Sequence, residues 1–138
     1  MAMQAGSQSV VHKGLIAMMV SYFRQQHYTD MLVNLPGFPK PFKIGRHIPD
    51  LTCRQANKEK TFIVLAAGTC DAISNDYTAE QWMAFYEYVN SVGGQFYIAV
   101  PTSCGCKSGR ALVRFRLREL CISADAIWVP QDKLIRVA

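Results

Sequence analysis

Apolar residues recur along the chain with two different periods, which predict helices and strands in turn. In residues 10–26 the apolar positions repeat as they do on the buried face of a helix. A second stripe of this kind begins at Thr78, where Thr-Ala-Glu-Gln matches a capping box, and ends at Gly93. Residues 108–120 fit either a helix or a strand, and their content of Arg, Leu and Ala favours the helix. The pattern therefore predicts three helices.

Runs of apolar and β-branched residues between these helices predict a sheet. Residues 48–55 and 61–67 flank a charged tip and predict an antiparallel hairpin. The second run is continuously apolar, as in a central strand that is covered on both faces. The helix before residues 95–101 favours a parallel crossover beside this central strand. Shorter strands are predicted at residues 31–35, 126–130 and 134–137.

The order of these segments predicts one α/β domain over residues 9–138. We expect a central mixed β-sheet flanked by helices, in the order α-β-β-β-α-β-α-β. Residues 1–8 are small and polar, and we expect a disordered tail there. With 138 residues, half of them hydrophobic, the chain is long enough to bury a core without metal or disulfide support.

Charge and hydropathy narrow the classes of partner. Fifteen Lys and Arg against ten Asp and Glu give a net charge of +5, which favours a polyanion such as DNA. No apolar run is long enough to span a bilayer, and the first residues lack the pattern of a secretory signal. We therefore expect a cytoplasmic protein without a membrane partner.

The cysteines and histidines form no pattern that identifies a metal site. Five cysteines show no disulfide framework, so reduced and mostly buried thiols are expected. The alternative is a thiolate metal site in which Cys104 and Cys106 join Cys70 or Cys121, although lone cysteines usually act as small hydrophobes. The histidines share no metal-site spacing and are expected at the surface or at helix ends: His12, His27 and His47.

A Pro-Asp pair at residues 49–50 stands sixteen residues before the end of the apolar strand at residues 66–68. In nucleases that cut phosphodiesters with Mg²⁺, such a pair is followed on the next strand by an acidic residue, one spacer and a lysine. With the Gln-Trp helix and the strand that follows it, this order resembles the restriction-endonuclease-like fold of the PD-(D/E)xK nuclease superfamily. The resemblance covers roughly residues 10–130.

The resemblance implies roles for individual residues. Asp50 takes the place of the first metal-binding carboxylate, which holds Mg²⁺ in active members, and Gln81 lies where several members place a glutamine that orients metal or substrate. Ala66 occupies the place of the second acid, and Gly68 that of the lysine. Asp71 is the nearest carboxylate that a tight turn would return to Asp50 as a relocated catalytic partner. The structural alternatives are a turn-stabilising Asp50 and a Gln81 that serves only the capping box.

Basic residues provide the candidate DNA contacts. One group lies around the proline-rich loop and the hairpin, and a second lies along the last predicted helix. One further cation lies on the first predicted helix. An arrangement of this kind either follows a phosphate backbone or keeps a surface solvated. The candidates are Lys13, Lys40, Lys43, Arg46, Arg54, Lys107, Arg110, Arg114 and Arg118.

Three hypotheses follow for the function. The first is a nuclease-fold protein with a degenerate metal site that serves as a DNA-associated binding module with little or no cleavage. The second is an active Mg²⁺-dependent DNA endonuclease that uses Asp50 with Asp71 and Gln81. The third is a non-catalytic structural or oligomerising protein, for which a homodimer is one form.

Overall fold

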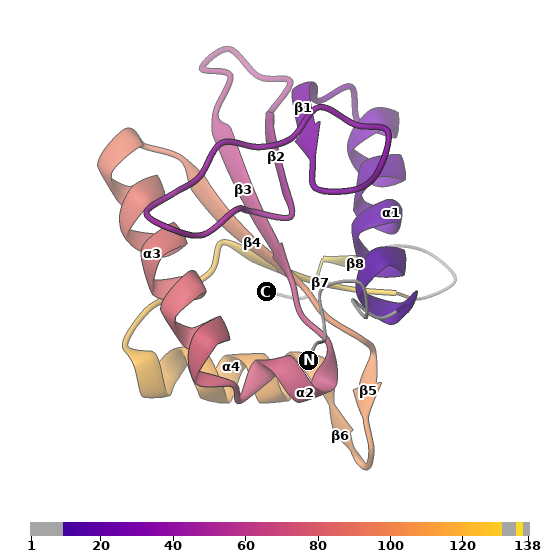
Figure 1. Ribbon diagram of the computed structural model, residues 1–138, viewed down its shortest axis with the longest axis vertical. Coiled ribbons are helices and arrows are strands. Elements are labelled where there is room, and N and C mark those ends of the chain that lie inside the picture. The colour runs from indigo at the N-terminus through magenta and orange to yellow at the C-terminus, as the bar shows by residue number, and fades with distance from the viewer. Residues whose placement is uncertain (1–9, 131–134, 137–138) are drawn as a thin grey trace.

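Six strands form one mixed sheet in a computed structural model that describes residues 10–130 and 135–136 (Figure 1). The strands of this sheet, in spatial order, are β1 (Thr29–Val33), β2 (Leu51–Arg54), β3 (Phe62–Ala67), β4 (Gln95–Ala99), β7 (Ala126–Val129) and β8 (Ile135–Arg136). The helices are α1 (Val10–Gln25), α2 (Cys70–Ile73), α3 (Asp76–Val92) and α4 (Gly109–Leu120). A separate hairpin of β5 (Ser103–Cys104) and β6 (Lys107–Ser108) precedes α4.

The strand directions confirm the predicted α/β architecture. Strands β1, β2 and β3 pair antiparallel, β3, β4 and β7 pair parallel, and β8 returns antiparallel to β7. The predicted hairpin is β2–β3, and the predicted parallel crossover joins β3 to β4 through α3. The chain is therefore a single α/β domain with a mixed sheet. The predicted tail at residues 1–8 lies outside the described residues.

Each face of the sheet is covered by helices, and the side chains of β3 alternate between them. Ile63, Leu65 and Ala67 pack with α1 on one face. Val64 and Ala66 pack with α3 and α4 on the other. Figure 1 shows α1 apart from α3 and α4, with the sheet between them. The uninterrupted apolar run of β3 thus reflects burial on both sides.

Three local features differ from the predictions. Helix α3 begins at Asp76 and not at Thr78, because Asn75 is the N-cap and accepts a hydrogen bond from the Tyr77 amide at 2.7 Å. Helix α2 and the β5–β6 hairpin were not predicted, since each is too short to show a period. Strand β1 begins two residues before the predicted start at residue 31. In the described part of the chain, no helix has both the length and the apolar character to cross a membrane.

Candidate functional site

A cavity of about 400 Å³ opens at the end of the sheet where β2 begins and β3 ends, and we call it the Asp50 cavity. Asp50 is the only carboxylate among its described lining residues. The other polar side chains come from α1, the β1–β2 loop and α3. They are His12, Asn34, Lys43, Arg46, Tyr77, Thr78 and Gln81.

Main-chain hydrogen bonds fix Asp50 at the edge of the sheet. Its amide donates to the Leu65 carbonyl at 3.1 Å, and its carbonyl accepts from the Asn34 amide at 2.9 Å. Its side-chain Oδ2 accepts from the Ala67 amide at 2.8 Å. The residue opposite the carboxylate is therefore Ala67, which contributes a backbone N–H and no side-chain ligand.

His12 is the ionisable neighbour of Asp50. Its Nε2 lies 3.4 Å from Asp50 Oδ1, and both side chains are largely buried. Burial lowers the pKa of His12, but the hydrogen bond and charge of Asp50, with a backbone hydrogen bond at Ala67, outweigh it and raise the pKa above 6.5. His12 lies in the first turn of α1, so the expectation of a surface or helix-end histidine is confirmed by its place at the helix end, although its side chain is largely buried. The expectation is wrong for His47, which is buried outside the helices, whereas His27 is exposed.

The Asp50 ion pair should make the contribution of His12 to stability depend on pH. Because its pKa is raised on folding, the stabilisation is fully present below pH 6.5 and is lost as the pH rises through the folded-state value. We expect His12→Gln to lower the free energy of unfolding by about 1 kcal/mol more at acidic than at alkaline pH, the scale of a charged hydrogen bond. Urea unfolding across this pH range measures the difference.

His27→Gln is the matched control, because His27 is exposed and lies outside the cavity. His47 lies 3.3 Å from a Glu80 oxygen and is the same in every protein compared. An equal effect of His12→Gln at all pH values would show that the Asp50 pair contributes no pH-dependent stability.

A tight turn in the β1–β2 loop presents Arg46 to the cavity. Ile44 and His47 are buried and exchange two backbone hydrogen bonds of 2.8 and 3.1 Å, while Gly45 between them has φ +64°. The guanidinium of Arg46 lies 2.7 Å from Glu80 on α3 and holds the pKa of that carboxyl below its usual range. Buried Ile44 and His47 thus hold the loop on both sides of the exposed Arg46 side chain.

The first turns of α3 supply the amide and hydroxyl groups of the cavity. Because the helix is capped by Asn75, Gln81 has no part in a capping box, and that structural alternative is wrong. Gln81 instead lines the cavity with Tyr77 and Thr78. Gln81 and Asp50 therefore line the same cavity.

Three positions that the nuclease motif singled out are not among the described residues that line the Asp50 cavity: the catalytic candidate Asp71, and Ala66 and Gly68, which stand in place of the second acid and the lysine. Asp71 is exposed on α2 and is not among the described residues that line the cavity. Ala66 is 2% exposed and packs in the apolar cluster beneath α3. A Cβ at Gly68 would meet only ordinary contacts, at 3.8 Å from Trp82 and 3.9 Å from Val100. Packing therefore does not require glycine at this position.

The predicted DNA-binding cations separate into groups. Lys43 and Arg46 line the Asp50 cavity, and Arg54 lines a second cavity at the turn of the β2–β3 hairpin. Lys40 donates to the Leu35 and Phe38 carbonyls of its own loop. The others are exposed away from the Asp50 cavity, two of them on a shallow hollow beside α4. These are Lys13, Lys107, Arg110, Arg114 and Arg118.

The side chains of the Asp50 cavity do not fit a resident Mg²⁺ ion. Mg²⁺ favours oxygen ligands with net negative charge, whereas a single carboxylate here shares the cavity with Lys43 and Arg46. Both oxygens of Asp50 already have partners, Ala67 and His12. Among the described residues, no group of three or more His, Cys, Asp or Glu side chains is arranged to hold a metal.

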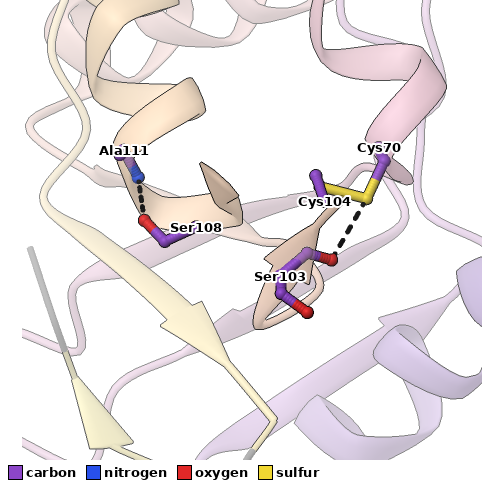
Figure 2. Close-up of a disulfide and its surroundings, with 5 residues drawn as sticks. All are labelled: Cys70, Ser103, Cys104, Ser108 and Ala111. Atoms are coloured by element: carbon purple, nitrogen blue, oxygen red, sulfur yellow. Dashed lines mark hydrogen bonds between the residues drawn. A yellow bond between two sulfur atoms is a disulfide. The ribbon is translucent and has the colours of Figure 1, made fainter. Parts of the chain in front are cut away.

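A disulfide joins Cys70 at the start of α2 to Cys104 on β5, across 34 residues of chain (Figure 2). The expectation of fully reduced cysteines is therefore wrong, and these two sulfurs are not available as metal ligands in this state. Cys53 is free and buried, and Cys106 and Cys121 are free and exposed. Because disulfides are rare in reducing compartments, a cytoplasmic location would leave this pair reduced in the cell.

The sequence reasoning missed His12 as a member of the site. Its signal was present, since His12 continues the buried stripe of Ile16, Met19 and Phe23 at helical spacing. Asn34, Tyr77 and Thr78 carried no comparable signal. Comparisons of this chain with protein-family models, curated proteins and solved structures find no match. The function is therefore inferred from the residues of the site.

Proposed function

We propose that the protein is a DNA-associated binding module on a nuclease-like framework, with little or no cleavage. The observation that carries this proposal is the Asp50 cavity, which Lys43 and Arg46 line together with one carboxylate that is already paired; Arg46 also lies 2.7 Å from Glu80. A phosphodiester is an anion with several acceptor oxygens, and it suits a polar cavity with two cations and several hydrogen-bond donors.

The charge of the whole chain supports the same ligand class. The net charge of +5 attracts polyanions over a distance, while the cavity supplies short-range donors. His12 adds to this when it is protonated, because its Nε2 lies at the carboxylate inside the cavity. The Asp50 cavity is thus best suited to a phosphate when the pH is low.

The nuclease-like framework is part of the proposal because of where Asp50 lies. It precedes β2, next to the end of the central strand β3, with α1 and α3 on either side. An active member would need a second carboxylate beside it, and Ala66 and Gly68 supply none. Loss of metal positioning removes most of the charge stabilisation on which this chemistry depends.

Binding and cleavage assays on the same DNA test the proposal. For two to three phosphate contacts, we expect the dissociation constant to rise about 10- to 40-fold between about 50 and 200 mM salt. We expect no cleavage of single-stranded, duplex or branched DNA with Mg²⁺ or Mn²⁺. Fluorescence anisotropy measures the first quantity and gel analysis the second.

Asp50→Asn sharpens the test, because the amide oxygen keeps an acceptor for the Ala67 amide while the charge is removed. A binding module should then bind DNA about 3- to 10-fold more tightly, since two charges about 4 Å apart in water interact by about 1 kcal/mol. Asp71→Asn is the matched control for net charge, as Asp71 is exposed outside the cavity.

The second candidate, a Mg²⁺-dependent endonuclease, is favoured by one observation, the shared cavity of Asp50 and Gln81. Cleavage that Asp50→Asn abolishes would replace the binding module by this enzyme. An additional loss in Asp71→Asn would assign the exposed carboxylate to it. Absence of both cleavage and salt-dependent binding would favour the structural or oligomerising protein, including a homodimer.

A further inference from the structure

A second cavity of about 420 Å³ lies beside the turn of the β2–β3 hairpin and the end of α3, and we call it the aromatic cavity. Three aromatic rings from separate elements line it. Phe42 belongs to the β1–β2 loop, Phe62 begins β3, and Tyr88 lies on α3. The rings converge from distant parts of the sequence.

The ring geometry leaves an aromatic surface open to solvent. Phe42 and Phe62 are nearly parallel, with ring centroids 6.0 Å apart and an interplanar angle of 14°. Tyr88 meets both with its edge, at centroid distances of 6.0 and 6.1 Å. Phe42 is 47% exposed, unlike the buried rings of the core. An exposed ring that continues a parallel stack is a platform for another flat π-system.

Charged side chains surround these rings with a positive balance. Arg54 and Lys60 line the aromatic cavity against one carboxylate, Glu59. The Arg54 guanidinium lies 5.2 Å from the centroid of the Phe62 ring and is held by a 2.9 Å hydrogen bond to the Lys60 carbonyl. Aromatic rings next to cations characterise sites for single-stranded nucleic acid, where bases stack and phosphates pair with the cations.

The aromatic cavity and the Asp50 cavity lie at opposite ends of β3 and of α3, and the β1–β2 loop contributes to both. Phe42 lines the first and Lys43 lines the second. Tyr77 and Tyr88 line one cavity each and are eleven residues apart on α3, so at 1.5 Å per residue the cavities are separated by about 16 Å along this helix. A strand of several nucleotides is therefore needed to reach both, and the phosphate next to a base in the aromatic cavity lies nearest to Arg54 and Lys60.

We propose that the aromatic cavity takes an unpaired base of single-stranded DNA, whose adjacent phosphates lie against Arg54 and Lys60 and whose strand continues along α3 to the Asp50 cavity. The inference rests on the proposed DNA binding and adds a substrate class to it. The bases of a duplex are stacked on one another and are not open to a protein ring, whereas those of a single strand are. The protein therefore binds single-stranded DNA in preference to duplex of equal length.

Phe42→Ala tests this base site with a short oligonucleotide that carries 2-aminopurine. Wild-type protein should quench its fluorescence on binding, because stacking on the ring quenches the base. The variant should lose this quenching and bind single-stranded DNA about 5- to 100-fold more weakly, the range for one base–aromatic stack. Its salt dependence and duplex affinity should stay unchanged, because no charge is removed.

Two further variants keep the test decisive. Phe115→Ala is the matched control, since Phe115 is exposed on α4 and lies outside the aromatic cavity. Phe42→Leu retains an apolar side chain against Phe62 and removes only the flat ring, so it serves if the alanine variant does not fold. It should lose quenching as Phe42→Ala does.

The outcomes separate the base site from the proposed function. Salt-dependent DNA binding that Phe42→Ala and Phe42→Leu leave unaltered would overturn the base site alone. Equal affinity for single-stranded and duplex DNA would overturn it as well. If neither form of DNA binds in a salt-dependent way, both the base site and the proposed DNA binding fail.

Discussion

Replacing both Lys43 and Arg46 by alanine is expected to weaken DNA binding about 30-fold, which corresponds to about 2 kcal/mol for two charged contacts. The two residues are the cations of the Asp50 cavity, and the loop that carries them is anchored by buried Ile44 and His47. The slope of log affinity against log salt should fall by about two, one for each phosphate contact. Anisotropy titrations at several salt concentrations give both values.

Arg24→Ala with Lys58→Ala is the matched control, because both side chains are exposed and line neither cavity. This pair lowers the net charge equally and should change affinity only through long-range attraction, which salt screens. Equal losses in the two double variants would mean that net charge alone governs binding. A further comparison with Arg110→Ala and Arg118→Ala would measure the contribution of α4.

Cys70→Ser is expected to lower the free energy of unfolding by about 2–4 kcal/mol under oxidising conditions, because the disulfide closes a long segment of chain in the unfolded state. The bridged cysteines are 34 residues apart. Wild-type protein in reductant should unfold at the same urea concentration as the variant. Equilibrium unfolding with and without reductant measures both effects.

Cys106→Ser is the control for this comparison, since Cys106 is free and exposed on the same hairpin. It should match wild type in either condition. A wild-type protein whose stability is insensitive to reductant would show that this disulfide does not contribute to stability.

Because Cys70 follows Ala67 by three residues, the same samples also report whether the disulfide affects DNA binding at Asp50.

The architecture followed from the sequence wherever one local signal was strong enough. The apolar run of β3 indicated burial on both faces, and the structure places α1 on one face and α3 with α4 on the other. Gly93 marked the end of α3 because its positive φ of 72° favours glycine. The start of that helix was wrong, since Asn75 and Thr78 are both good caps and only the fold decides between them.

The candidate site was predicted in part, because its members meet only in three dimensions. Asp50 and Gln81 were found through a motif and lie in one cavity. His12 was dismissed because histidines were sought by mutual spacing, whereas its partner is a carboxylate 38 positions later in the chain. Cys70 and Cys104 carry no local signal of their pairing, which depends on the packing of both α2 and β5 against α4.

One segment, the β1–β2 loop, supplies Phe42 to the aromatic cavity and both Lys43 and Arg46 to the Asp50 cavity. Loops accept insertions and deletions more readily than the strands they connect. Ligand preference can therefore diverge among descendants of this chain by changes within a single short stretch, while the sheet that holds Asp50 is inherited intact. Exchanging the β1–β2 loop between two such descendants would transfer the ligand preference of one to the other.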